Sequence, residues 1–306
     1  MIDVVIVNWN SGDYLQKCIQ SIFSTDNKNF IHTIFIIDNN SKDSSMQQIE
    51  SNDQIEIIWN KENKGFAKAC NQGFKLCTSP YILLLNPDTQ LLNFTLKDCI
   101  SFIEKESTID ILGCQLLNEK GEISPSCSKF PSAFGIFIDA TGLSKMAPSI
   151  FKPGIIMTDW DHKKSRFVDQ LMGAFMFMRK TVFEKMGYFD ERFFVYFEEV
   201  DFSRRLNELG GKSFFNANIK AIHAGEGTTS SVKGFRLFLN LRSRLQYAKK
   251  HFNFWEYAIV WLVTYFIEPF TRSVFLIFSG RIKEMKDLWI GYKLLTGIKK
   301  NKLTLD

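Results

Sequence analysis

Short apolar runs of strand type alternate with segments of helical periodicity through the first 120 residues, and this alternation constrains the fold more than any other feature. Strands are expected at residues 4–7, 34–37, 55–59 and 81–85, and helices at 14–23, 45–51, 66–77 and 96–105. The strands are continuously apolar, which is typical of strands covered by helices on both faces. The sequence therefore predicts an α/β, Rossmann-like fold with a mostly parallel sheet flanked by helices.

The rest of the chain divides into a loop-rich middle and a helical end. Residues 118–165 contain four prolines and no clear period, so long loops are expected there. Further strands are expected within 167–178 and at 219–222, and helices at 181–186 and 200–209. From about residue 235 the pattern is helical. We therefore predict a first domain of residues 1–230 and a helical region of residues 231–306.

Polar side chains recur directly after the predicted strands. The residues in these positions are Asn8, Asp38, Asn40, Asn86, Asp88 and His223. Ligands of open α/β sheets bind outside the carboxyl ends of the strands, so parallel neighbours would bring Asn8, Asp38 and Asp88 to one cleft. Any one such cluster is also typical of turns and helix caps. Three of them at corresponding strand ends favour a binding site.

These side chains suit a nucleoside diphosphate bridged by a metal. No G-x-G-x-x-G follows the first strand and no P-loop motif occurs, which disfavours a dinucleotide-binding dehydrogenase and a P-loop NTPase. A carboxylate such as Asp38 can bind a base or ribose. Asp88 can bind Mg²⁺ or Mn²⁺, because Mg²⁺ uses one or two protein carboxylates together with substrate phosphates. The turn at Gly65–Phe66 opens a helix whose N–H groups can face an anion; an ordinary loop–helix junction is the alternative.

Glu198, Glu199 and Asp201 form the densest acidic cluster of the chain. On a helix, Asp201 can pair with Arg204 or Arg205, which leaves Glu199 for another role. A carboxylate in a cleft can act as a general base. The alternative is a solvated helix start, where acidic residues favour the helix dipole. The many aromatic neighbours favour a cleft wall.

His223 precedes a glycine-rich stretch, residues 224–229, of the kind that can close over a substrate. A lone histidine is more often structural than a ligand. Its position at a strand end before such a loop favours a metal ligand.

The helical region is basic and aromatic. Residues 231–306 carry a net charge of +9 in a chain whose total is +5. The longest uncharged apolar stretch, residues 257–267, is about half of the roughly 20 residues that a spanning helix needs, which disfavours a simple transmembrane segment. Apolar, Trp-containing helices beside Lys and Arg favour a position in the membrane interface. Packing on the first domain, or on a second copy in a homodimer, is the alternative. Nucleic acid is not expected, because the aromatic residues are embedded among aliphatic ones.

The cysteines and the N-terminus favour a cytoplasmic location. None of the six cysteines forms a C-x-x-C pair, so neither a zinc site nor a disulfide framework is expected. The first ten residues contain no basic segment before their apolar run, unlike a signal peptide. Together with the basic helical region, this predicts a protein peripheral on the inner face of the cell membrane.

In this order, the motifs resemble family 2 glycosyltransferases of the GT-A fold, and within them the rhamnosyltransferase-like branch. The resemblance covers roughly residues 2–230 and is carried by VVIVNWNSGDYLQKCIQSI, IIDNNSKDSS, NKGFAKACNQG, LLLNPDT, GAFMFMRKTVFEKMGYFDERFFVYFEEVDFSRR and the late His223. It implies a nucleotide-sugar donor, a divalent metal and inversion at the anomeric carbon. The nucleotide-binding candidates are then Asn8, Asp38, Asn40, Gly65, Phe66 and Asn86.

The resemblance also implies the metal and catalytic residues. Asp88 stands in the second position of the family's Asp-x-Asp motif, and His223 matches a late histidine that completes the metal or diphosphate site. The first position of that motif is an asparagine here, which leaves fewer charges for the metal. The family's base is usually the Asp of a Glu-Asp pair, which reads Glu198–Glu199 in this chain. Glu199 is the predicted base, with Glu198 and Asp201 as alternatives.

The predicted function is inverting, metal-dependent transfer of a sugar, with rhamnose as one candidate, from a nucleoside-diphosphate sugar to a saccharide acceptor. The amphipathic helical region suggests a polyprenyl-diphosphate-linked acceptor, as in O-antigen or capsule assembly. A nucleotidyltransferase is one alternative, although residues 8–14 lack the basic residue that its phosphate loop normally needs. A membrane-associated nucleotide-sugar-binding protein without turnover is the other.

Overall fold

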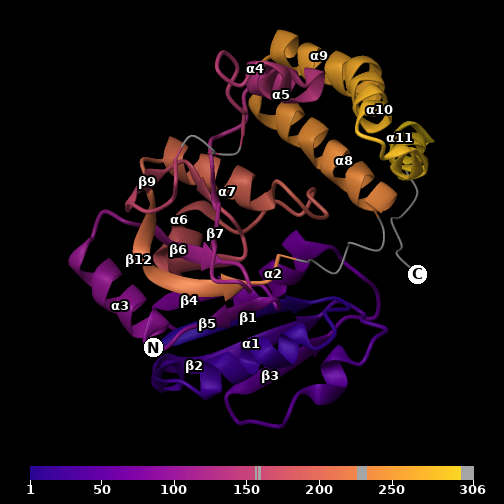
Figure 1. Cartoon of the computed structure of the whole chain (residues 1–306). Helices are drawn as coiled ribbons and strands as arrows, with labels where there is room; N and C mark the ends of the chain where they lie inside the picture. The colour runs from indigo at the N-terminus through magenta and orange to yellow at the C-terminus, as the bar shows by residue number, and fades with distance from the viewer. Residues whose placement is uncertain (156, 158–159, 226–232, 298–306) are drawn as a thin grey trace. The chain divides into compact units, whose positions relative to one another are not determined.

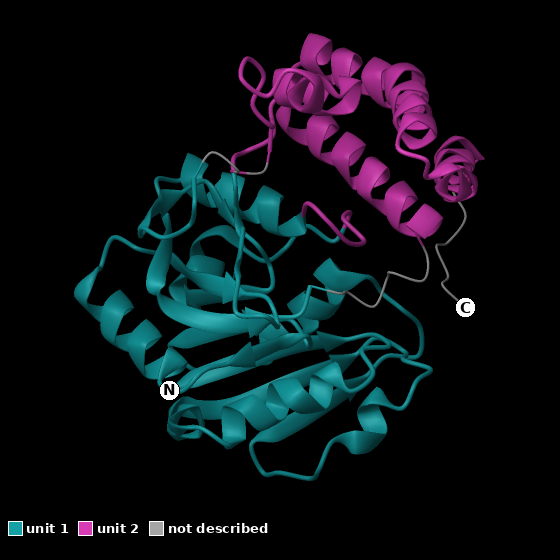
Figure 2. Ribbon diagram, in the orientation of Figure 1, with its two compact units in different colours: residues 1–128, 160–191, 198–228 teal, residues 129–159, 192–197, 229–306 magenta. Residues whose placement is uncertain are grey.

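A computed structural model describes residues 1–155, 157, 160–225 and 233–297 (Figure 1). The chain forms two compact units, coloured separately in Figure 2. Unit 1 comprises residues 1–128, 160–191 and 198–228, and unit 2 comprises residues 129–159, 192–197 and 229–306. Unit 2 therefore comprises two internal segments of the chain in addition to the C-terminal region. The predicted boundary at residues 230–231 lies outside the described residues.

Unit 1 is built on a ten-stranded mixed sheet. Its strands are β1 (Ile2–Asn8), β2 (Ile31–Asp38), β3 (Ile55–Trp59), β4 (Tyr81–Leu85), β5 (Thr89–Leu91), β6 (Ile111–Leu117), β7 (Ile123–Ser124), β9 (Arg166–Val168), β11 (Phe175–Arg179) and β12 (Ser213–His223). The order along the sheet is β3-β2-β1-β4-β11-β6-β12-β5, with β7 on β6 and β9 on β12. Strands β8 (Cys127–Ser128) and β10 (Gln170–Leu171) form a separate antiparallel pair.

The first four strands of this order are parallel, as the strand–helix alternation predicts. Strand β11 then runs antiparallel between β4 and β6, while β6 and β12 are parallel. The prediction of an α/β fold flanked by helices is confirmed. The antiparallel β11 falls in the stretch 167–178, where strands were predicted without a direction.

Helices cover this sheet because each has one apolar stripe. They are α1 (Tyr14–Phe23), α2 (Phe66–Leu76), α3 (Thr95–Lys105), α6 (Thr181–Met186) and α7 (Glu198–Glu208), with short 3₁₀ segments at Asp26–Phe30 and Ser45–Gln48. Helix α1 is typical: it buries Leu15, Cys18, Ile19 and Ile22, which lie three or four residues apart. These side chains join the main core with apolar residues of β1, β2 and β4.

Several elements were not predicted from the sequence, among them strand β6 and the helices within residues 133–146. Strand β6 contains Gly113, which weakens a strand pattern; a methyl group there would lie 2.3 Å from Cδ2 of Leu171, so only glycine fits. The loops expected at 118–165 are wrong in part, because α4 (Ala133–Thr141) and α5 (Leu143–Met146) lie there. Helix α4 is apolar almost all round and shows little periodicity. Its end signals were readable: Ser132 caps its N-terminus and Gly142, in the left-handed region, ends it.

Unit 2 is helical, and the helical prediction for the C-terminal region is confirmed. Besides α4 and α5 it contains α8 (Lys233–His251), α9 (Phe254–Leu262), a π-helical turn (Val263–Ile267), α10 (Glu268–Phe278), a 3₁₀ turn (Ile282–Glu284) and α11 (Met285–Gly297). Within the described part of the chain, residues 254–278 form one helical run long and apolar enough to cross a membrane by length and composition alone. The prediction against a simple spanning segment counted only uncharged residues, whereas this run includes Glu256, Glu268 and Arg272.

A buried ionic cluster ties the helices of unit 2 together. Glu268, 1% exposed, accepts from Arg244 on α8 and from Nε of Arg272 one turn along α10, at 2.8 Å. Arg244 also donates to Oγ1 of Thr264 in the π-helical turn, at 2.8 Å. Removing one member of such a cluster leaves a buried charge unpaired, which is strongly destabilising. The charges inside the 254–278 run therefore serve packing within this unit.

Candidate active site

The ends of β1 and β2 are joined by a buried side-chain network. Asn8 and Asp38 are direct partners in the parallel register. The Asn8 amide donates to Oδ1 of Asp38 at 3.0 Å and to the hydroxyls of Ser41 and Ser45 at 3.0 and 2.9 Å. Asn8 has no exposed surface and Asp38 only 3%. Asn8 thus holds the loop after β2 in shape, and Asn40 lies in this loop with a left-handed φ of 65°.

Asn39, which was not among the predicted site residues, connects this loop to the start of α2. Its amide nitrogen donates to Oδ1 of Asn63 at 2.8 Å and to the carbonyl of Gly65 at 3.3 Å. Its amide oxygen accepts from the backbone N–H of Lys64 at 3.0 Å. The Gly65–Phe66 turn, from which α2 begins, is therefore fixed next to the carboxyl end of β2. The sequence signal for Asn39 was present, since it directly follows Asp38.

Asp88 and His223 meet although 135 positions separate them in the sequence. Strand β12 pairs antiparallel with β5 so that His223 lies opposite Thr89. Nε2 of His223 is 3.3 Å from Oδ1 of Asp88, and their side chains are 11% and 10% exposed. The pairing of β5 with β12 produces this contact, because Asp88 directly precedes β5 and His223 is the last residue of β12.

Glu198 and Glu199 begin α7, and each has a buried Oε2 atom without a hydrogen-bond partner. Burial, reinforced by the charge of Glu199, raises the pKa of Glu198 well above its ordinary value. Burial also raises the pKa of Glu199, to about 7. Glu198 is 4% exposed, whereas the Glu199 side chain is only half-buried. Glu199 is therefore the carboxylate of this pair that can both lose its proton near neutral pH and be reached.

Two left-handed residues lead directly into this acidic pair. Tyr196 and Phe197 have φ values of 67° and 69°. Bulky residues rarely adopt this conformation, which costs on the order of 1–3 kcal/mol each and is concentrated at functional sites. The backbone therefore turns sharply just before Glu198, where the carboxylates begin.

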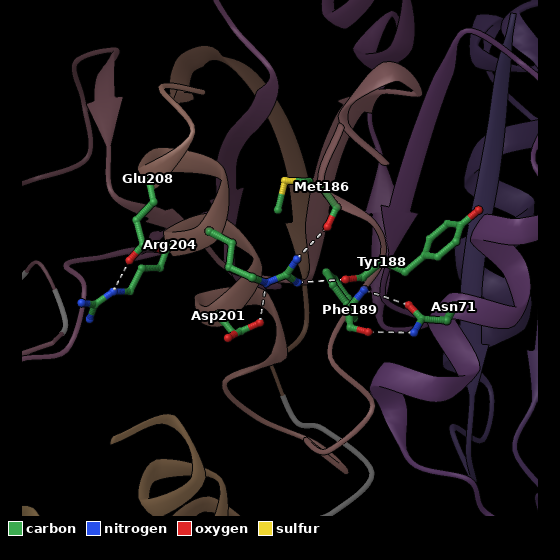
Figure 3. Close-up of polar contacts among 8 residues, drawn as sticks. Asn71, Met186, Tyr188, Phe189, Asp201, Arg204 and Glu208 are labelled. Carbon is green, nitrogen blue, oxygen red and sulfur yellow. Dashed lines mark hydrogen bonds and ion pairs between the residues drawn. The ribbon is translucent and has the colours of Figure 1, made fainter. Parts of the chain in front are cut away.

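Asp201, the third acidic residue, has a structural partner (Figure 3). Its Oδ2 accepts from Nε of Arg205 at 2.9 Å, and Asp201 has no exposed surface. The same guanidinium donates to the carbonyls of Met186 and Tyr188 at 3.0 and 2.8 Å. Of the two pairings that the sequence allows, the structure thus has Asp201 with Arg205, while Arg204 contacts Glu208 at 3.1 Å. Asp201 anchors α7 to the segment before it.

Gly173 and Ala174, which sequence reasoning missed, lie between the metal candidates and the acidic pair. The carbonyl of Ala174 accepts from the N–H of Asn86 at 3.0 Å and from the hydroxyl of Thr89 at 3.3 Å. A methyl group on Gly173 would lie 4.0 Å from Cγ of Glu199 and 4.0 Å from Cε1 of Phe66. These two residues therefore bring the Asn86–Thr89 loop, Glu199 and the start of α2 to one place within unit 1.

Among the described residues, two side chains are candidate metal ligands, which is fewer than a complete metal site needs. In the described part of the chain, no group of three or more His, Cys, Asp or Glu side chains is close enough to hold an ion. Asp88 and His223 supply one carboxylate and one imidazole. That set fits a cation whose remaining ligands are water and substrate phosphates. The glycine-rich stretch predicted to close over substrate lies largely in residues 226–232, outside the described part.

Comparison with known proteins finds distant relatives of this chain. The chain is 23% identical over 248 residues to the low-salt glycan biosynthesis hexosyltransferase Agl10 of Haloferax volcanii, covering 79% of this chain and 74% of that protein. It is 20% identical over 278 residues to the N-acetylglucosaminyl-diphospho-decaprenol L-rhamnosyltransferase of Mycobacterium tuberculosis, covering 85% and 88%.

The fold is that of solved glycosyltransferases. The mannosyltransferase of Pyrobaculum calidifontis, solved with GDP-Man and Mn²⁺, superposes with a TM-score of 0.58 over 97% of this chain and 88% of that one, at 10% identity. This likeness shows a GT-A fold. The family model described as glycosyl transferase family 2 matches residues 3–187. This chain therefore belongs to glycosyl transferase family 2 and is a glycosyltransferase.

Proposed function

We propose that this glycosyltransferase transfers a sugar from a nucleoside-diphosphate sugar to a hydroxyl of a saccharide acceptor, with inversion and with a divalent cation. The observation that carries the proposal is the position of Gly173 and Ala174. The carbonyl of Ala174 accepts hydrogen bonds from the Asn86–Thr89 loop, and Gly173 approaches Glu199. Glu199, which can accept a proton, therefore lies on one side of Gly173–Ala174. The loop that contains Asp88, a candidate cation ligand, lies on the other side. Transfer in one displacement needs this separation of a base from the leaving diphosphate.

The chain's own residues divide the work. Asp38, held by Asn8, binds the nucleoside, and the N–H groups at the start of α2 face the diphosphate. Asp88 and His223 hold the cation, Mg²⁺ or Mn²⁺, which when bound offsets the negative charge that develops on the departing diphosphate. Glu199 accepts the proton of the attacking hydroxyl. Asp201 and Arg205 keep α7, and with it Glu199, in place.

The sugar and acceptor follow from the relatives. The mycobacterial relative is named for rhamnose and for a diphosphate-linked polyprenol acceptor, and the archaeal relative for hexose. We infer a deoxyhexose or hexose donor, with rhamnose as the first candidate. We infer a saccharide linked to a polyprenyl diphosphate as the acceptor, in the assembly of a cell-surface polysaccharide.

A panel of nucleotide sugars tests the proposed function. Purified full-length protein should release a nucleoside diphosphate from at least one donor, with Mg²⁺ or Mn²⁺ and not with EDTA. The Asp88→Ala variant should lose this release, and the exposed-site control Asp53→Ala should keep it. Silence of the wild type across the panel, with nucleotide-sugar binding unaffected by Asp88→Ala, would instead favour the binding protein without turnover.

The surface of unit 2 supports binding to the inner face of the cell membrane. Large apolar side chains on its last helices are exposed by 39–88%, namely Phe254, Trp255, Ile259, Trp261, Leu262, Phe266, Phe270, Phe275, Ile277, Phe278, Ile282, Trp289 and Ile290. Monomeric soluble proteins rarely expose so many together. The surrounding net positive charge suits anionic lipid. We propose that this aromatic surface lies in the membrane interface.

Replacing two residues of this aromatic surface should release the protein from vesicles. Trp255→Glu with Phe278→Glu removes two of its most exposed side chains, 75% and 88% exposed. We expect sedimentation with phosphatidylglycerol vesicles to weaken by roughly tenfold or more, because each aromatic contributes more than 1 kcal/mol when buried. Trp59→Glu, on an aromatic of unit 1 that is 62% exposed, is the control. Unchanged sedimentation, or loss of a homodimer in its place, would assign the aromatic surface to a second copy.

A further inference from the structure

Helix α8 is basic along its whole length. It contains six Lys and Arg residues and no Asp or Glu. One of these arginines, Arg244, is neutralised by Glu268 in the buried cluster described above. Arg242, two positions earlier on a different face of the helix, has no such partner among the residues that the structure describes.

The environment of Arg242 is unfavourable for an unpaired cation. Its Nη1 atom is buried and has no hydrogen-bond partner. Burial lowers the pKa of Arg242, and among the described residues no carboxylate counters this effect. A guanidinium presents five N–H donors and is always charged, so a buried donor without an acceptor is costly. Within the described part of the chain, nothing supplies the hydrogen-bond acceptor that this buried donor needs.

Gln246 completes the arrangement one helical turn further on. Residues four apart lie on the same face of a helix. Oε1 of Gln246 is likewise buried without a hydrogen-bond partner. A guanidinium beside an amide offers donors for phosphate oxygens together with a group that can accept from, or donate to, a sugar hydroxyl.

The same stretch of α8 is bonded to the segment that leads into the acidic pair. The hydroxyl of Ser243 donates to the carbonyl of Val195 at 2.8 Å. The rings of Tyr247 and Phe197 are 5.5 Å apart, and Phe197 directly precedes Glu198 in the sequence. Through these contacts α8 packs on residues 195–197 within unit 2.

We propose that Arg242 and Gln246 form a phosphate-binding site on α8 that takes the phosphate-bearing end of a prenyl-linked sugar acceptor. The inference rests on the proposed function, because that function requires an acceptor of this class. It adds the residues that recognise the phosphate group. Arg242 forms bidentate hydrogen bonds to phosphate oxygens, and Gln246 binds the adjoining sugar.

Binding of farnesyl diphosphate, with farnesol as its phosphate-free counterpart, tests the site. Titrations are done on the full chain in EDTA, to keep the diphosphate from entering a metal-dependent donor site. We expect wild type to prefer farnesyl diphosphate, and Arg242→Gln to bind it at least about tenfold more weakly while binding farnesol unchanged. The matched control is Arg236→Gln, which removes an exposed arginine from the same helix and should bind as wild type does.

Thermal melting separates this role from a structural one. Because Arg242 bears a desolvation cost without a partner, Arg242→Gln should melt at or above the wild-type temperature when no ligand is present. A lower melting temperature with unchanged binding would overturn the proposal, as would a wild type that binds both probes equally. Arg242-dependent binding to phosphatidylglycerol vesicles equal to that of farnesyl diphosphate would assign the site to lipid headgroups and overturn the acceptor assignment. If farnesyl diphosphate binds through Arg242 but no sugar transfer is found, the proposed reaction fails and this site stands.

Discussion

Glu199→Gln should lose sugar transfer by roughly 10²- to 10⁴-fold while still binding the nucleotide-sugar donor. The amide has the shape of the carboxyl group and cannot accept the proton of the attacking hydroxyl. Glu199 is the preferred base because its pKa is about 7 and its side chain is only half-buried, whereas the side chain of Glu198 is 4% exposed. The measurement is single-turnover transfer at saturating donor, alongside donor binding by calorimetry.

Two further variants make this result decisive. Glu208→Gln, at the exposed end of the same helix, should leave the rate unchanged. Glu198→Gln should lower the rate less than Glu199→Gln, because Glu198 is 4% exposed and is less accessible to an acceptor hydroxyl. If Glu198→Gln abolishes transfer and Glu199→Gln retains it, the two roles are exchanged.

The raised pKa of Glu199 also sets two pH dependences. Transfer requires the deprotonated base, so kcat/KM should rise with pH up to about 7 and level off above it. Stability should run the other way. Because folding raises this pKa, the protonated form stabilises the fold, and that contribution is full below about pH 4.5 and lost as the pH rises through about 7. Glu199→Gln should therefore melt increasingly above wild type between pH 5 and pH 8.

Asp88→Asn should remove most of the metal-dependent donor binding, lowering kcat/KM by roughly 100-fold or more. The amide keeps the size of the side chain and can still contact His223, so the fold should persist. His223→Gln should lose less, since it removes a neutral ligand and leaves the carboxylate. Binding of Mn²⁺ in the presence of the nucleoside diphosphate, followed by electron paramagnetic resonance, measures the effect directly.

The outcome that contradicts the metal assignment is specific. If Asp88→Asn and His223→Gln both bind Mn²⁺ and donor as wild type does, the 3.3 Å contact between the two side chains is structural. Asp53→Asn, which changes an exposed carboxylate in the turn before β3, is the control for a general change of charge.

Much of unit 1 was predictable because its signals are local. The strands β1, β2 and β4 each contain an unbroken apolar run, and the polar residues that follow these runs mark the edge where Asp38 and Asp88 lie. Strand β6 was missed because Gly113, needed for the close approach of Leu171, interrupts its pattern. Helix α4 was missed because burial on several sides removes the periodicity by which helices are recognised. Asn39 and Gly173 were not predicted as site residues, because only their tertiary contacts mark them. Asn39 contacts the segment before α2, and Gly173 lies next to Glu199.

The sequence by itself determined the parallel half of the sheet, the polar strand ends and the family, since each depends on residue types within a few positions of one another. Only the tertiary structure decided that His223 meets Asp88 and that Asp201 pairs with Arg205. It also decided that Gly173 lies between Glu199 and the loop of Asn86. These contacts depend on where β11 and β12 enter the sheet and on how α7 begins. Strand order and helix entry are set by packing between segments far apart in the chain, and no local pattern of residues records that packing.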